Sequence, residues 1–173
     1  MFRKSIAPVV SFGLSLAIAA SAQAQETDSE LFRVTVPSTL SITAPSATVS
    51  QIHDETDNDQ VFPIQRWLVT ANNTGGAMAV FTTDQAFTHT LDSNYKRDAY
   101  LTLAKASGDA WTVTNGSATT NYGSSLEEVS VTAESFTPGA ANFDIGVSLV
   151  EETFTDLAAG DYELTVTGTL TAK

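Results

Sequence analysis

Strict alternation of apolar and polar residues near the end of the chain constrains the fold more than any other feature. Over residues 162–171, one set of alternate positions holds Tyr162, Leu164, Val166, Gly168 and Leu170. The other set holds a glutamate followed by threonines. Successive side chains of a β-strand point to opposite faces, so this pattern predicts a strand with one buried and one solvated face, as antiparallel sheets commonly have.

The same alternation recurs through most of the chain after residue 30. It is clearest over residues 129–134 and 143–149, and it is less regular over residues 32–36, 40–42, 67–71, 77–81, 101–103 and 111–113. Turn-forming pairs such as Asn115-Gly116 and Gly160-Asp161 separate these segments. About eight to ten short strands with frequent turns predict an all-β fold, a single antiparallel β-sandwich in preference to a barrel.

The first 24 residues have the three-part layout of a secretory signal peptide. Arg3 and Lys4 precede an apolar run over residues 6–20, and the small-x-small pattern Ala22-Gln23-Ala24 follows it. We therefore expect cleavage after Ala24 and export to the periplasm, the cell surface or the medium. The predicted domains are a signal peptide over 1–24, a flexible junction over 25–30 and a β-sandwich over 31–173.

Charge and composition exclude several classes of partner. The chain has 20 acidic and 8 basic residues and a formal net charge of −12. Nucleic acid is not an expected partner, because its binding is driven by clustered Lys and Arg. Cysteine is absent, which excludes a thiol nucleophile and Cys-based zinc sites. After the signal peptide no apolar run approaches the ~20 residues of a membrane span, so we expect no transmembrane segment.

The sequence contains no catalytic signature that we can identify, and we expect no enzymatic activity. Its two histidines, His53 and His89, are interpreted as ordinary loop or surface residues. The paired carboxylates Glu127-Glu128 and Glu151-Glu152 would point to opposite faces of a strand, so neither pair forms a glycosidase-type acid and nucleophile. Their simplest interpretation is a solvated acidic surface.

One acidic cluster suggests a calcium site. Calcium takes six to eight oxygen ligands, which a loop rich in Asp and Asn can supply. The candidate ligands are Asp54, Glu55, Asp57, Asn58 and Asp59. Their spacing does not match an EF-hand, and the alternative is a polar loop before the strand at Trp67. No other cofactor is expected.

Aromatic residues suggest a second kind of site. Tyr95, Tyr100 and Tyr122 lie in or near predicted loops and strand ends, where sugar rings could stack on them. Trp67 and Trp111 instead lie in alternating patterns, where a role in the core is usual.

The closing segment resembles the end of several bacterial surface proteins. The Gly160-Asp161-Tyr162 turn and the Thr/Val-rich strand after it are similar to those of fimbrial subunits, the spore coat protein U group and WxL-type surface domains. The segments beginning at Trp67 and Trp111 also suit that group. The cysteine pair of many fimbrial subunits is missing. The resemblance implies an immunoglobulin-like fold and a structural or adhesive role, and it carries over no catalytic residue.

Two functions from different classes follow. The first is a non-enzymatic secreted structural or adhesive surface component that assembles by strand addition, with itself or other surface proteins as partners. Residues 31–36 are the candidate donor strand, and the alternative is that they pair within their own domain. The second function is a monomeric extracellular binding module for carbohydrate or calcium, with its site in loops at one end of the sandwich.

Overall fold

The computed structural model describes residues 26–45, 48–150 and 153–173. The predicted signal peptide lies outside the described residues. The chain divides into two compact units, residues 1–35 and 36–173, and every described strand belongs to the second. The only helices of the described part are two single 3-10 turns, η1 (Tyr122–Ser124) and η2 (Phe154–Asp156), neither of which could cross a membrane.

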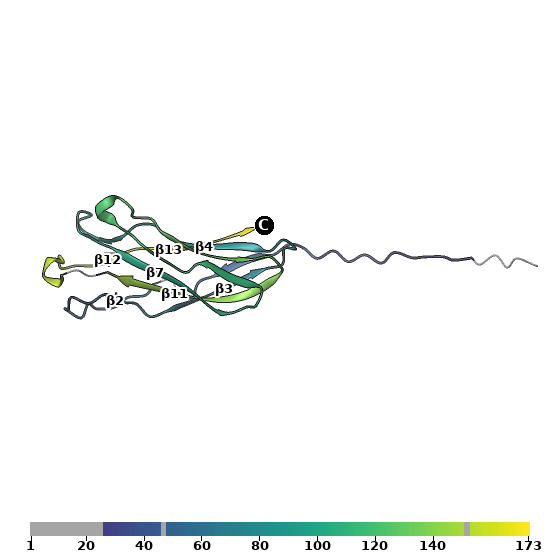
Figure 1. Ribbon diagram of the computed structural model, residues 1–173, viewed down its shortest axis with the longest axis horizontal. Helices are drawn as coiled ribbons and strands as arrows, with labels where there is room; N and C mark the ends of the chain where they lie inside the picture. Colours follow the sequence, from purple (N-terminus) through teal and green to yellow (C-terminus); the bar gives the residue numbers. More distant parts are fainter. Residues whose placement is uncertain (1–25, 46–47, 151–152) are drawn as a thin grey trace, which may run out of the picture. The chain divides into compact units, whose positions relative to one another are not determined.

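Residues 36–173 form antiparallel sheets, which confirms the predicted all-β antiparallel class (Figure 1). The first sheet contains, in spatial order, β1 (Leu40–Thr43), β3 (Gln65–Ala71), β11 (Gly139–Leu149), β7 (Ala99–Ser107) and β9 (Ser117–Thr119), with β2 (Gln60–Val61) also paired to β11. The second contains β13 (Val166–Ala172), β4 (Ala77–Thr83), β10 (Ser130–Ser135) and β8 (Trp111–Asn115). A small third sheet contains β12 (Tyr162–Glu163), β5 (Phe87–His89) and β6 (Lys96–Arg97). The immunoglobulin-like topology stays a prediction.

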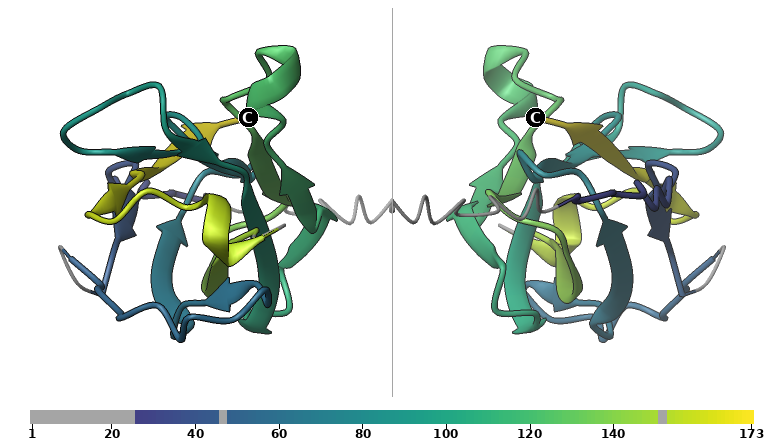
Figure 2. Two further views of the ribbon diagram at one scale, coloured as in Figure 1. Left: turned by 90° about the vertical axis from the view of Figure 1, so that its left-hand side faces the viewer. Right: turned by 90° about the vertical axis from the view of Figure 1, so that its right-hand side faces the viewer.

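Both 3-10 turns lie at the same end of the strand-containing unit, together with β12 (Figure 1). The left-hand view of Figure 2 looks onto that end, where the yellow-green η2 lies in front of the strands. The C-terminus of β13 lies toward the opposite end (Figure 1). The loops of one end are therefore built from residues far apart in the sequence.

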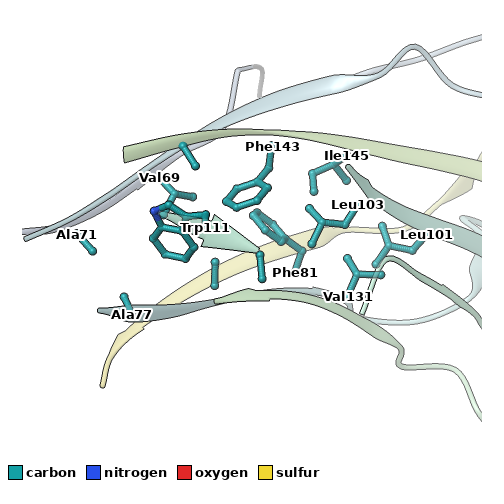
Figure 3. Packing of buried hydrophobic residues seen from close by; sticks show 13 residues of the cluster. Val69, Ala71, Ala77, Phe81, Leu101, Leu103, Trp111, Val131, Phe143 and Ile145 are labelled. Atoms are coloured by element: carbon teal, nitrogen blue, oxygen red, sulfur yellow. The ribbon is translucent and has the colours of Figure 1, made fainter. Parts of the chain in front are cut away.

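The main core lies between the first and second sheets (Figure 3). Phe143 of β11 is at its centre, with ring centroids 5.7 Å from Trp111 of β8 and 6.1 Å from Phe81 of β4, both in edge-to-face geometry. Trp111 is fully buried and its indole N–H donates to the carbonyl of Gly139 at 3.3 Å. Such aromatic pairs add to the stabilisation from area burial alone, and the predicted core role of Trp111 is confirmed.

A second, smaller core lies under β5 and β12. Phe87, Ala99 and Leu149 are buried there, and Phe62 and Tyr162 pack against them. The rings of Phe62 and Phe87 stack at 5.6 Å. Leu149 is the last residue of β11, so this long strand contributes to both cores.

The final strand differs from its prediction in one respect. Burial alternates without interruption from Tyr162 to Leu170, as predicted, but the ladder is split into β12 and β13 at Leu164-Thr165. The cause is Asp84, whose Oδ1 accepts the N–H of Thr165 at 2.8 Å and whose own N–H donates to the Thr165 carbonyl at 3.0 Å. The chain passes here from the third sheet to the second.

The predicted strand over residues 32–36 is also not found. Residues 26–39 contain no strand in the structure, whereas Leu40–Thr43 form β1 as expected. Alternation alone does not make a strand, because a strand also needs a partner for its main-chain hydrogen bonds.

Candidate functional site: an open groove between two sheet edges

A groove of about 540 Å³ opens where the two cores meet. Val147 of β11 forms part of its floor and packs against both cores. Other apolar side chains also line it, among them Phe62, Trp67, Ile145, Leu164 and Val166. Ile145 is buried and the other four are only partly buried, so apolar surface remains accessible inside the groove.

One wall of the groove is the edge of β3. Strand β1 pairs with residues 68–71 of β3 and ends at Thr43, so its pairing does not extend along Gln65–Trp67. In this register the position opposite Arg66 is Pro45, which has no N–H to donate. Pro45 lies in a bend and lines the groove. The sequence Ala44-Pro45 therefore ends β1, and no strand of the described residues pairs with this part of the edge.

The opposite wall is the start of β13, an edge strand of the second sheet. β13 pairs with β4 from Val166 to Ala172, and no strand of the described residues pairs with its other side. Leu164 and Val166 face the groove, and Asp161 and Glu163 are exposed residues of its lining. The lining of the groove is thus both apolar and polar, since it also includes His53, Gln60 and Gln65.

Farther along β13, the two edges approach each other and close the groove. Gly168 faces Trp67 of β3 and Ile42 of β1, and a Cβ at 168 would lie 2.7 Å from the nearest atom of each. Only glycine fits this approach without displacing a side chain. The groove is therefore bounded by the contact of Gly168 with Trp67.

An ion pair joins β3 to β11 on the outward-facing side of the first sheet. The guanidinium of Arg66 donates to both carboxylate oxygens of Asp144, at 2.7 and 3.0 Å. These hydrogen bonds, and then the positive charge, hold the pKa of Asp144 below its usual range. Both residues belong to neighbouring strands of the first sheet, so the pair supports the β3–β11 ladder.

The candidate donor segment exposes its apolar residues. Phe32 is 83% exposed, Val34 88% and Val36 75%. Arg33 is the only charged residue within 31–36. Large side chains at this level of exposure, spaced as on one face of a strand, have apolar area available for burial against a partner.

The five candidate calcium ligands lie in the loop before β2. Oδ1 of Asp54 accepts hydrogen bonds from the Thr56 hydroxyl at 2.7 Å and from the Gln60 amide at 2.7 Å, and the Thr56 hydroxyl is the main reason that the pKa of Asp54 is lowered. Asp57 accepts the N–H of Phe154 at 2.8 Å. These bonds order the loop with donors from the chain itself. No group of three or more acidic or histidine side chains in the described ranges is placed to hold a metal ion. Calcium binding by Asp54, Glu55, Asp57, Asn58 and Asp59 stays a prediction.

The three candidate stacking residues lie on different elements. Tyr100 is on the outer face of β7, Tyr122 begins η1, and Tyr95 lies between β5 and β6 with its ring 6.1 Å from that of His89. All three are partly exposed, and none of them lines the groove. Sugar stacking on these residues stays a prediction.

The two histidines differ in environment. His53 accepts the N–H of Glu55 at 2.9 Å and stacks on Phe154, within the loops at one end. His89 is buried, not a surface residue: its Nδ1 accepts the N–H groups of Leu91 and Asp92 at 3.2 and 3.1 Å, and its Nε2 lies 3.1 Å from the Ala159 carbonyl. This arrangement ties two loops together and leaves the ring no free position for substrate chemistry.

The alternation and turn patterns of the sequence did not predict the groove between the edges of β3 and β13. Comparison of the chain with protein-family models, with curated proteins and with solved structures found no match. The resemblance to fimbrial subunits, the spore coat protein U group and WxL-type domains therefore stays a prediction. The groove has to be interpreted from its own residues.

Proposed function

We propose that this chain is a secreted, non-enzymatic structural or adhesive component of a cell surface, and that its copies assemble by strand addition through residues 31–36. The observation that carries the proposal is the exposure of Phe32, Val34 and Val36 in a segment with a strand-like pattern but no strand. Adding such a segment to a sheet edge satisfies its main-chain groups and buries its alternate side chains.

The energetics favour burial of this segment in an assembly. Removing a Val or Phe side chain from water contributes about 1.5–3 kcal/mol. Three such side chains offset much of the entropy that is lost when two chains associate. Among the described residues, β1, β9, β8 and β13 are the edge strands of the two larger sheets, and they are the candidate acceptor positions.

The chemistry of the groove favours a structural role over catalysis. Active sites usually gather titratable groups with strongly shifted pKa values in a cleft. The lowered pKa values of Asp54 and Asp144 instead arise from hydrogen bonds to Thr56 and Arg66 outside the apolar groove. The groove lining combines aliphatic and aromatic side chains, which can bind a chain, with polar residues that include His53, Asp161 and Glu163.

The proposal is tested with the chain lacking residues 1–24. Phe32→Asp combined with Val34→Asp should abolish concentration-dependent assembly in sedimentation, because a buried unpaired carboxylate is costly. Leu126→Asp, at another exposed apolar position, should assemble like the parent. Equal assembly of the parent and the double variant, or loss of the folded state on deleting residues 25–36, would refute donation.

The groove also supports the alternative function, a monomeric binding module. Its volume falls in the range of small-ligand sites, and Trp67 and Tyr162 offer aromatic surface to a sugar ring. A chain that stays monomeric at every concentration and binds a glycan with a change in Trp67 fluorescence would favour this alternative.

A further inference from the structure

We propose that the groove between β3 and β13 binds an elongated amphiphile with an apolar tail and a cationic head. This inference goes beyond the proposed assembly and does not depend on it. The tail would lie along β11 toward Trp67, and the head would lie near Asp161 and Glu163. The shape of the groove, the chemistry of its lining and the placement of charge each support this ligand class.

The floor of the groove is a strip along one face of β11. Ile145, Val147 and Leu149 are alternate residues of this strand, so their side chains point to the same face. All three line the groove, and they extend over about 13 Å of the strand. The cavity of about 540 Å³ falls within the range of small-ligand sites. An elongated ligand therefore fits this shape better than a compact one.

The sides of the groove are formed by the chain itself. Pro45 and residues 48–51 line the side next to the edge of β3, and residues 160–166 line the other side. The groove is therefore a channel bounded by the chain's own segments. Such a channel favours a slender small molecule as its occupant.

Polarity changes along the groove. The contact of Gly168 with Trp67 closes one end, and Val166 lies two residues before Gly168 on β13. The lining continues from Val166 back along the chain to Asp161 and Glu163, which are both exposed. One end of the groove is thus closed and apolar, and the lining away from it becomes acidic. An amphiphile with its tail toward Trp67 matches both ends.

The charge of the lining favours a cationic head. Among the described residues that line the groove there is no lysine or arginine, and the acidic ones are Asp161 and Glu163. Arg66, Lys96 and Lys173 pair with carboxylates that do not belong to the lining. The formal net charge of −12 adds long-range attraction for a cation. An anionic head of the same size would be repelled.

The floor offers few partners to the hydroxyl groups of a sugar. Gln60 lies beside Leu149 and is buried, and its amide nitrogen donates to Asp54 and to the Asn58 carbonyl at 2.7 and 2.8 Å. Its side-chain oxygen accepts the N–H of Asp54 at 3.2 Å. Because the polar group of Gln60 is engaged and the floor is aliphatic, hydroxyl groups buried there would lack partners, which is costly. A hydrocarbon tail incurs no such cost.

The test uses the chain lacking residues 1–24 and decyltrimethylammonium, at concentrations below those that form micelles. Binding should change the fluorescence of Trp67, and Trp67→Phe should remove the response because Trp111 is fully buried. Decanoate has a similar tail and an anionic head, tetramethylammonium is the head alone, and maltotriose is a neutral sugar. Each should bind at least about tenfold more weakly, because it lacks the tail or the matching charge.

Two double variants separate local charge from net charge. Asp161→Asn with Glu163→Gln should weaken binding of decyltrimethylammonium about fivefold, since exposed charge pairs contribute modestly. Asp109→Asn with Glu128→Gln removes the same charge from exposed positions outside the lining and should bind like the parent. Equal affinities of the two double variants would overturn recognition of a cationic head.

The position of the ligand is measured independently from amide NMR shifts. Decyltrimethylammonium should shift the amides of Val147, Leu164 and Val166 most. Shifts confined to other parts of the chain, or no binding at all, would overturn the groove as its site. Equal or tighter binding of decanoate or maltotriose would overturn the ligand class.

A further variant separates this inference from the proposed assembly. The Phe32→Asp, Val34→Asp chain should bind decyltrimethylammonium like the parent, because neither residue lines the groove. Loss of binding in this variant would overturn the assignment to the groove. A parent chain that stays monomeric and binds the amphiphile would refute the assembly and leave this inference intact.

Discussion

Gly168 on β13 lies directly against the indole of Trp67 on β3, so that a Cβ at position 168 would come within 2.7 Å of Cζ3. This contact joins the edges of the two sheets. Gly168→Ala should lower the free energy of unfolding by about 1–3 kcal/mol, because the added methyl must displace Trp67 or Ile42. Urea denaturation followed by tryptophan fluorescence measures the change.

The control for this substitution is Gly123→Ala. The nearest heavy atom to a Cβ at 123 is the side-chain oxygen of Asn121 at 3.6 Å, an ordinary contact. Its stability should stay within about 0.5 kcal/mol of the parent. A Gly168→Ala chain as stable as the Gly123→Ala chain would show that the two edges are not in close contact.

His89 should be required for the order of the end that contains β12. His89→Ala removes the acceptor of the Leu91 and Asp92 N–H groups and the contact with the Ala159 carbonyl. Leaving such groups without partners costs about 1–3 kcal/mol. Thermal unfolding should show the loss. Gly160→Ala should act in the same direction, because a Cβ there would lie 2.1 Å from the His89 Nε2 and φ of Gly160 is +148°.

Amide hydrogen exchange locates the effect of these substitutions. Faster exchange should be confined to Leu91, Asp92 and their neighbours and should not reach the main core at Phe143. An unchanged exchange rate at Leu91 in His89→Ala would contradict the assigned role of the ring.

The Arg66–Asp144 pair predicts a pH dependence of stability. Arg66 lowers the pKa of Asp144 in the folded state, so its contribution is fully present above the ordinary carboxyl pKa of about 3.9. The contribution disappears as pH falls through the lowered folded pKa. Asp144→Asn should therefore be slightly less stable than the parent at pH 7, and the difference should vanish near pH 2. A difference between parent and Asp144→Asn that is the same at both pH values would contradict this.

The strands with one face in the core were predictable from sequence. β10, β11 and β13 alternate because each has its inward residues against the opposite sheet. The break at Leu164-Thr165 was not predictable, because it depends on Asp84, which is distant in sequence. The Asn115-Gly116 pair separates two strands, but its place in the topology was not predictable. It joins β8 to β9, which lie in different sheets, and does not close a hairpin.

The groove depends on long-range pairing, and for that reason the sequence patterns did not reveal it. Proline disfavours strand pairing at position 45, but its register opposite Arg66 follows only from the β1–β3 ladder. Leu164 was recognised as an inward residue, yet nothing in its own segment indicates that the opposite edge is left open. The His89 site was hidden for the same reason, since Ala159 and Gly160 reach it from a distant part of the chain.

Assembly should strengthen with salt. The chain has a formal net charge of −12, so copies repel each other at low ionic strength. Raising NaCl from about 0.02 to about 0.5 M shortens the screening length to a few Å and should increase the assembled fraction. Dynamic light scattering measures it. Assembly that weakens steadily with salt would indicate that ion pairs between copies outweigh the apolar contacts.

The central claim is that copies of this chain associate through residues 31–36, and the most direct measurement is the light-scattering mass of the chain lacking residues 1–24. It is compared with Phe32→Asp, Val34→Asp, each in calcium and in chelator. The account predicts masses that grow with concentration for the parent and a monomer for the variant. Dependence on calcium would place Asp54–Asp59 at a junction between copies. A strict monomer for the parent at every concentration, with and without calcium, would contradict the account.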